Sequence, residues 1–492
     1  MKKQIQRTTT SKSAAATDEQ VKVWNVLIYM AADNNLKEEC MFALTEILKA
    51  GATPGIDVIA QFDSGDAITQ FDFSKLPKNI GKYDRKTLEV GKIAETILSD
   101  PKAILNVSDT QMLNDFLSQR LGKPEDQHYN MIILSGHGSG AVGDFLANTN
   151  PPSALSIPGL KLALESACEQ IGRKIDVLGM DSCLMSMIEV CYELRNEIDF
   201  LIGAEGFERS TGWPYLEILE VLKSNLKVLA EDSEASLEEL TGAIVSEYVR
   251  YYFPYHLSGV SVDLAACDLR DSNNVDTLKA FINRLAEALR DNLDDQRVKN
   301  AVLVAHWKAQ SYKFEQYVDL WDFCHLLRSD LLNGVYGEDD PGSDWDKVKS
   351  AIESACWDVM TAVEAIAKYS CYSGAAFQHS HGLSIYFPWA KSDLDRDLEH
   401  YRKLAFAKAT QWDEFLEVYG RETQREVRDD GNKGIGGEKP IPMPSRPEAG
   451  TTVRVNVQAG ERVNVQAGER VGRVVVAQVK NEPTSFYKDD CG

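Results

Sequence analysis

The sequence lacks the features of membrane proteins and of nucleic-acid-binding proteins. No apolar run is long enough to span a bilayer, and no apolar segment of a secretory signal follows the basic start of the chain. Asp and Glu (75) outnumber Lys and Arg (53), and the net charge of −22 disfavours nonspecific binding to nucleic acid or anionic membranes. We therefore expect a cytoplasmic protein that binds neither nucleic acid nor membrane.

Cysteine motifs are also missing. The nine cysteines are odd in number and form no C-x-x-C pair, which disfavours both a disulfide framework and a zinc ribbon. The chain has no G-x-S-x-G nucleophile elbow, so a serine hydrolase of the α/β type is not expected. With 492 residues, 43% of them hydrophobic and 26% charged, the composition is typical of a globular protein of several domains.

Apolar strand-like runs alternate with helical patterns through the first half of the chain. The runs are VWNVLIYMAA, IDVIAQFD, YNMIILS, KIDVLGM and FLIGAEG, and helix-patterned segments such as NNLKEECMFALTEILKAG and IPGLKLALESACEQIG lie between them. This alternation predicts an α/β/α sandwich with a mostly parallel sheet.

The second half is predicted to form a largely helical C-terminal domain. Two strand-like runs, LSGVSVDLAA and HGLSIYFPW, either return to the sheet or pair within the second domain. The predicted organisation is a disordered tail over 1–20, an α/β domain over 21–265, the helical domain over 266–419, a linker over 420–451 and a tail over 452–492. The last segment contains VNVQAGER twice in tandem, which is too short to bury a core of its own.

A glycine run, SGHGSGAVG, follows one of the predicted strands. Gly138, Gly140 and Gly143 match G-x-G-x-x-G, the pattern of a dinucleotide-binding turn. That motif requires a helix to begin at its third glycine, but two adjacent prolines and an asparagine-rich stretch come next and disfavour one. We therefore predict that these glycines allow a close approach of the backbone for another purpose.

Two reactive side chains stand at successive predicted strand ends. His137 follows one buried strand and Cys183 the next, where open α/β sheets place their ligands. We predict that Cys183 lies at the exposed start of a helix, because Leu184, Met187, Ile188, Cys191 and Leu194 form a helical apolar stripe. A thiol beside an imidazole suits nucleophilic catalysis, and the backbone amides of Gly138 and Cys183 could face an oxyanion. Asp181 is a natural cap for that helix.

Several blocks together resemble the clostripain family of cysteine peptidases. They are NVLIYMAADNNL, IILSGHGSG, GMDSCLMSMIEVCYEL, STGWPY, YVDLWDF and GLSIYFPWA, within residues 21–420. The resemblance implies a caspase-like fold, a dyad of His137 and Cys183, and hydrolysis of peptide bonds after Arg or Lys. It also implies that Asp181 lies in the pocket for the basic side chain, so the alternatives for Asp181 are a helix cap and a pocket acid.

The chain departs from the family pattern near this pocket. Thr211 precedes Gly212 and Trp213 where relatives have an acidic residue, so the pocket is less acidic unless Glu205 or Glu208 substitutes. The substrate-binding residues implied by the resemblance are Asp181, Thr211, Trp213 and Glu205.

Some relatives need calcium, and some are activated by cleavage after a basic residue beyond the histidine. The candidate calcium ligands Asp33, Asp63 and Asp144 have no EF-hand spacing, so we expect no required cofactor and leave calcium open. His379 and His381 lack neighbouring ligands and are assigned a structural role rather than a metal site.

No Lys or Arg occurs between Gly138 and Leu160, which predicts that the chain does not mature by self-cleavage there. The alternative function is a caspase-like scaffold without peptidase activity.

Overall fold

The computed structural model describes residues 24–65, 68–75, 96–97, 109–124, 128–149, 152–226, 233–312, 316–332 and 344–430. Its centre is a nine-stranded sheet with the order β13-β10-β9-β8-β5-β1-β2-β3-β4. The strands are β1 (Trp24–Ala31), β2 (Ile56–Asp63), β3 (Ile68–Asp72), β4 (Thr96–Ile97), β5 (Tyr129–Ser135), β8 (Ile175–Asp181), β9 (Ile198–Gly203), β10 (Val262–Asp268) and β13 (Ala367–Ser373).

The five central strands, β9-β8-β5-β1-β2, run parallel, and the strands on both sides of them pair antiparallel. These five correspond to the five predicted apolar runs, and every residue of β1, β5 and β8 is buried. Continuous burial is expected for parallel strands covered on both faces. The predicted α/β/α sandwich is therefore confirmed, with antiparallel strands outside its parallel centre.

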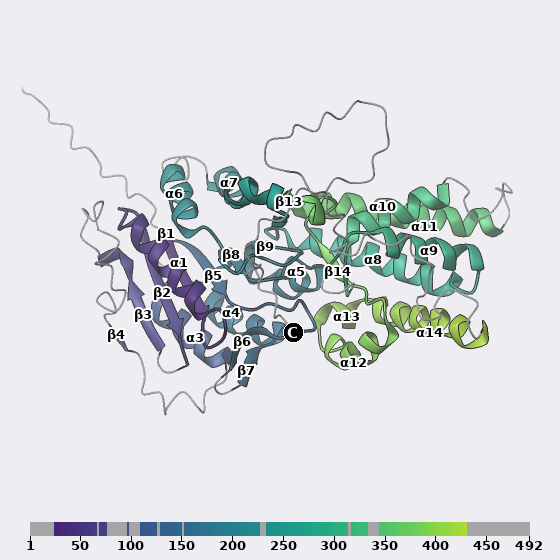
Figure 1. The fold of residues 1–492 in the computed structure, drawn as a ribbon, viewed down its shortest axis with the longest axis horizontal. Helices are drawn as coiled ribbons and strands as arrows, with labels where there is room; N and C mark the ends of the chain where they lie inside the picture. Colours follow the sequence, from purple (N-terminus) through teal and green to yellow (C-terminus); the bar gives the residue numbers. More distant parts are fainter. Residues whose placement is uncertain are drawn as a thin grey trace, which may run out of the picture.

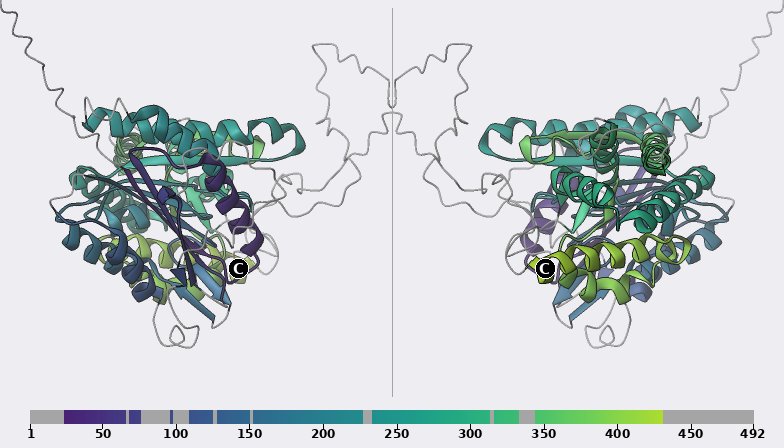
Figure 2. Two further views of the ribbon diagram at one scale, coloured as in Figure 1. Left: turned by 90° about the vertical axis from the view of Figure 1, so that its left-hand side faces the viewer. Right: turned by 90° about the vertical axis from the view of Figure 1, so that its right-hand side faces the viewer.

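Helices cover both faces of the sheet (Figures 1 and 2). One layer consists of α1 (Lys37–Ala50), α6 (Tyr215–Asn225) and α7 (Ser233–Tyr252), and the other of α3 (Asp109–Arg120), α4 (Ile157–Ile171) and α5 (Ile188–Leu194). Alternate residues of β1 separate accordingly, since Val26 and Ile28 pack in the first layer and Leu27 and Tyr29 in the second.

The C-terminal helices lie together at one end of the molecule, beyond β10 and β13 (Figure 1). They are α8 (Ser272–Asn292), α9 (Gln296–Lys308), α10 (Leu320–Leu332), α11 (Asp344–Ile366), α12 (Lys391–Tyr401), α13 (Ala405–Ala409) and α14 (Trp412–Asp430). Short 3-10 helices are η1 (Phe73–Lys75), η3 (Phe253–Ser258) and η4 (Ala375–Phe377). The helical C-terminal region is thus confirmed, while the exact domain boundaries stay a prediction.

The two strand-like runs of the second half have different partners. The first forms β10, which joins the main sheet. The second contains β14 (Ser384–Tyr386), which pairs with β12 (Tyr317–Asp319) in a small sheet that also holds β11 (Ser311–Tyr312). Helix α14 continues to Asp430, so the start of the predicted linker is helical. The N-terminal tail and the tandem repeat lie outside the described residues.

Within the described residues, no helix is both long and apolar enough to cross a membrane. Eight of the nine cysteines fall in this part of the chain, and all eight are free thiols.

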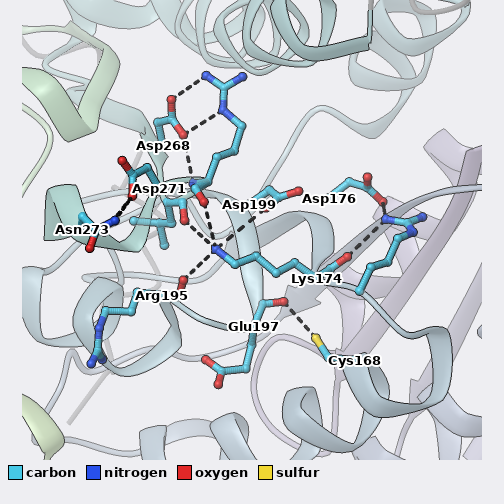
Figure 3. Close-up of polar contacts among 12 residues, drawn as sticks. Cys168, Lys174, Asp176, Arg195, Glu197, Asp199, Asp268, Asp271 and Asn273 are labelled. Carbon is cyan, nitrogen blue, oxygen red and sulfur yellow. Dashed lines mark hydrogen bonds and ion pairs between the residues drawn. The ribbon is translucent and has the colours of Figure 1, made fainter. Parts of the chain in front are cut away.

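Polar groups surround the edge of the sheet at which β8 and β9 begin, which we call the amino-end edge (Figure 3). The ammonium of Lys174 donates to the carbonyl oxygens of Arg195 and Leu269, at 2.9 and 2.8 Å, and its Nζ lies 4.0 Å from a carboxylate oxygen of Asp199. The Cys168 thiol donates to the carbonyl of Glu197, at 3.1 Å. These contacts tie the ends of neighbouring strands to one another.

Candidate active site

His137 and Cys183 lie together at the opposite, carboxyl-end edge of the sheet. The last paired residues of the neighbouring parallel strands β5 and β8 are Ser135 and Asp181, and His137 and Cys183 each follow two residues later. The strands stay in contact beyond that pair, because the Gly136 amide donates to the Asp181 carbonyl at 3.2 Å. The register therefore brings the two predicted catalytic residues to adjacent positions.

Gly138 allows the two chain segments to approach closely at this point. A Cβ atom added to it would lie 2.3 Å from the carbonyl oxygen and 3.1 Å from the amide nitrogen of Cys183. Real Cβ atoms do not tolerate the first distance, so only glycine fits without a shift of the backbone. The close backbone approach predicted for the glycine run is thus made to Cys183 itself.

A residue that sequence reasoning missed holds the imidazole of His137. Its Nε2 lies 2.5 Å from Oδ1 of Asn35, in the turn between β1 and α1. An amide oxygen only accepts hydrogen bonds, so Nε2 carries the proton and Nδ1 is the nitrogen able to accept one. The preceding Asn34 fixes this turn by donating to the carbonyl of Ala147, at 2.8 Å. The paired asparagines in AADNNL were the available sequence signal.

Cys183 does not begin a helix, which corrects our prediction. Helix α5 starts only at Ile188, and Cys183 is fully buried rather than exposed. The reason is local: Leu184 has φ of +64°, which is incompatible with an α-helix, and its amide donates to the carbonyl of Gly206 at 3.0 Å. Tertiary hydrogen bonds therefore hold the thiol in a tight turn, which we call the nucleophile turn (residues 182–187).

The C-terminal region supports the nucleophile turn directly. Ser186 donates from its hydroxyl to the carbonyl of Gly382, at 2.7 Å, and its own carbonyl accepts from the amide of Ser384, at 3.0 Å. Just beyond the turn, Glu189 accepts from the amide of Tyr386, at 2.8 Å. Strand β14 is thus hydrogen-bonded to the segment that presents Cys183.

Asp181 accepts hydrogen bonds from three groups of the protein. The hydroxyls of Ser135 and Tyr215 donate to Oδ2, at 2.6 and 2.9 Å, and the amide of Trp213 donates to Oδ1, at 3.1 Å. Burial and the nearby Asp181 carboxylate raise the pKa of the Tyr215 hydroxyl well above its usual range, so Tyr215 stays a donor. Asp181 is not the cap of this helix, because α5 starts at Ile188 and its N-cap residue is Met187, with no side-chain cap hydrogen bond.

The carboxylate of Asp181 lines a pocket at this edge. The other lining residues are Leu36, Glu39, Cys40, Ala43, Ser135, Ser210, Thr211 and Gly212. Gly212 lies close to the acid, since a Cβ atom added to it would be 2.7 Å from Oδ1 of Asp181. Thr211 is at the exposed rim, and its hydroxyl is 2.8 Å from that of Tyr252.

Two other predicted pocket residues are placed elsewhere by the structure. The indole of Trp213 is buried against Gly179 in β8, so only its amide reaches Asp181. Glu205 is fully buried and accepts from the amide of Gly382, at 2.7 Å, away from the pocket lining. Burial and then Asp319 raise the pKa of Glu205 well above its usual value.

Glu208 does not replace the missing acid either. It accepts from the indole nitrogen of Trp213, at 3.0 Å, and is not among the lining residues. The substitution of Thr211 for an acid is therefore not compensated by Glu205 or Glu208.

No nucleotide-binding helix follows the glycine run. Residues after Gly143 instead form a hairpin of β6 (Phe145–Thr149) and β7 (Pro152–Leu155), as the prolines suggest. Within the described ranges, no three His, Cys, Asp or Glu side chains are grouped so that they could hold a metal ion. His381 stacks on Trp321, at 4.1 Å between ring centroids, and its Nδ1 lies 3.2 Å from Asp319.

The chain is similar to known proteins in sequence pattern and in fold. The model of the clostripain family matches residues 28–419. A secreted C11 cysteine protease from Bacteroides thetaiotaomicron, solved in complex with an irreversible peptide inhibitor, is 16% identical, with a TM-score of 0.54 over 80% of this chain and 100% of that one. A second structure of a secreted C11 cysteine protease from that organism is 15% identical, with a TM-score of 0.51 over 79% of this chain and 99% of the other.

An inactive zymogen C11 protease from Parabacteroides distasonis is 17% identical, with a TM-score of 0.50 over 79% of this chain and 98% of that one. No curated protein sequence matches the chain. At these identities the solved structures support the shared fold.

Proposed function

Because the chain belongs to the clostripain family, it is a cysteine-type peptidase that acts on peptides or proteins, and we propose that it cleaves after Arg or Lys through a dyad of His137 and Cys183. The observation that carries this proposal is the register of β5 and β8. It brings an imidazole and a thiol to adjacent strand ends, beside a pocket that contains the Asp181 carboxylate.

The proposed reaction proceeds through an acyl-enzyme. Nδ1 of His137 accepts the thiol proton, and the sulfur of Cys183 attacks the carbonyl carbon of the scissile bond. The C–N bond then breaks and the leaving amine takes the proton from His137. A water molecule then loses a proton to His137 and attacks the thioester. The C–S bond breaks, the acid product leaves, and the sulfur of Cys183 takes the proton back from His137.

The developing oxyanion needs hydrogen-bond donors near Cys183. We assign this role to the backbone amides of Gly138 and Cys183. Gly138 supports it because its amide makes no hydrogen bond to another described residue and its backbone lies against Cys183. A donor left unpaired before the reaction is available to the transition state.

The basic specificity is proposed from the charge and the lining residues of the pocket. Leu36, Cys40 and Ala43 offer an apolar wall for an aliphatic stem, and Asp181 offers an anionic end. A Lys or Arg side chain has this combination of an apolar stem and a cationic head. Because the segment from Gly138 to Leu160 contains no Lys or Arg, we further propose that the enzyme does not mature by cleavage there.

The test is hydrolysis of fluorogenic peptides carrying Arg, Lys, Asn, Asp or Leu before the cleaved bond, with and without added calcium. We expect the Arg and Lys peptides to be hydrolysed much faster than the other three, with no requirement for calcium, and no turnover by Cys183→Ala. Asp181→Asn should lower turnover of the basic peptides while leaving Cys183 reactive toward iodoacetamide. Retained hydrolysis in Cys183→Ala would refute the mechanism, and equal cleavage of all five peptides would refute the specificity.

Analysis of the purified active enzyme by intact mass addresses maturation. We expect the segment between Gly138 and Leu160 to be uncut. An active enzyme nicked within it would contradict the proposal.

A further inference from the structure

The pocket contains a second acidic residue, which comes from a part of the chain distant from Asp181. Glu39 lies in the first turn of α1 and lines the same pocket as Asp181, Thr211 and Gly212. Sequence reasoning placed candidate second acids at 205 and 208, but neither of those residues lines the pocket. The fold supplies the acid from the helix that follows β1.

The two pocket carboxylates differ in how far the protein already satisfies them. Both oxygens of Asp181 accept hydrogen bonds, from Ser135, Tyr215 and Trp213. Oε2 of Glu39 is buried, and no described residue donates a hydrogen bond to it. A buried carboxylate oxygen without a donor is unfavourable, and a cationic ligand in the pocket would satisfy it.

We propose that Glu39 is a specificity residue that receives the cationic head of the substrate side chain together with Asp181; this inference rests on the basic specificity proposed above. A guanidinium carries five N–H donors in a planar fork, more than the remaining lone pairs of Asp181 can accept. Glu39 adds a second anionic acceptor and compensates for the neutral Thr211 at the rim.

The experiment compares Glu39→Gln with Glu38→Gln. Glu38 is the preceding residue of the same helical turn and is exposed, so its substitution removes an equal charge without touching the pocket lining. Each variant is assayed on peptides that carry Arg, Lys or citrulline before the cleaved bond. Citrulline has nearly the shape of arginine but no charge, so the Arg-to-citrulline ratio isolates recognition of the cation.

We expect Glu39→Gln to lower kcat/KM for the Arg peptide about 10- to 100-fold, as for a lost charge-assisted hydrogen bond, mainly through KM. Citrulline hydrolysis should stay unchanged, and Glu38→Gln should match the wild type on all peptides. Glu39→Asp, which keeps the charge, should recover part of the Arg preference. Thermal melts of each variant verify folding.

Two results would overturn the inference, and they are distinguishable. If the wild type prefers Arg to citrulline and Glu39→Gln keeps the same ratio, Glu39 has no role in specificity while the proposed function stands. If the wild type cleaves peptides without regard to the charge before the bond, the basic specificity itself fails, and the inference fails with it.

Discussion

The two edges of the central sheet both contain a cysteine thiol and charged side chains, but these groups have different neighbours at each edge. At the amino-end edge, the Cys168 thiol donates to a backbone carbonyl, and burial raises its pKa to about 11. At the same edge, the Lys174 ammonium donates to the backbone carbonyls of Arg195 and Leu269. At the carboxyl-end edge, Cys183 and His137 each follow the end of one of two neighbouring strands, and Asp181 lines a pocket.

The difference shows why residue type alone does not identify an active site. A polar group whose hydrogen bonds are completed by the protein stabilises the fold, whereas a group that faces a pocket or a reactive neighbour is available for chemistry. Both kinds are present on one sheet, and sometimes on one strand: β8 follows Lys174 and ends at Asp181. Substitutions at matched positions of the two edges should therefore separate activity from stability.

The largest contrast is expected between the two cysteines. Cys183→Ala should lower kcat by at least about a thousand-fold, because it removes the proposed attacking sulfur. Cys168→Ala should keep the rate within about two-fold, since its thiol is protonated and engaged with Glu197. Hydrolysis of the Arg peptide by both variants measures this, and equal losses in the two would remove the distinction between the edges.

The next contrast uses glycine. Gly138→Ala should lower kcat about 100-fold, because a new Cβ must push the backbone of Cys183 from its position. Its counterpart is Gly172→Ala, at the end of α4, where the Cβ would meet only Pro124 at 3.4 Å but φ is +71°. That change should cost about 1 kcal/mol of unfolding free energy and leave kcat intact. Assays and urea melts of both variants test the pair.

A smaller effect is expected for Asn35, the asparagine in contact with the His137 ring. Asn35→Ala should lower kcat/KM about ten-fold, because the ring loses the acceptor that fixes its tautomer. Asn273→Ala removes an asparagine whose side-chain amide donates to Asp271 near the amino-end edge (Figure 3), and it should leave kcat/KM unchanged. An unchanged rate in Asn35→Ala would exclude the positioning role.

The smallest effect is expected for Asp199, whose substitution should change only the pH dependence of the unfolding free energy. Burial raises the pKa of Asp199 to about 6, so its contribution to stability is present below its unfolded pKa near 4 and is lost as pH rises through about 6. The Asp199→Asn variant cannot ionise at this position. Its unfolding free energy should therefore fall between pH 4 and 7 by about 1 kcal/mol less than that of the wild type. Urea melts at both pH values measure it; an identical fall in both proteins would contradict the assignment.

The strand ends of the active site were predictable because their signal is continuous burial. Five apolar runs located the parallel strands, and the residues after two of them are His137 and Cys183. Parallel pairing of these two strands was enough to predict that His137 and Cys183 lie at the same edge of the sheet.

The helix at Cys183 was wrongly predicted for a physical reason. The spacing of Leu184, Met187 and Ile188 is helical, but hydrogen bonds to Gly206 and Gly382 hold residues 182–187 in a turn. Those partners lie more than 20 and almost 200 residues away, so no local pattern contains them. Asn35 and Glu39 were missed likewise, because the fold alone brings the end of β1 and the start of α1 to this edge.

The hydrogen bonds between Ser186 and β14 have a consequence for how the protein is made. Synthesis proceeds from the N-terminus at up to about 20 residues per second, so Ser384 leaves the ribosome at least about 10 s after Cys183. Until then the nucleophile turn has its partner Gly206 but lacks the partners Gly382 and Ser384. A chain interrupted before β14 would contain both members of the proposed dyad without their support. Completion of the polypeptide is thus a built-in delay before this peptidase can act on its neighbours.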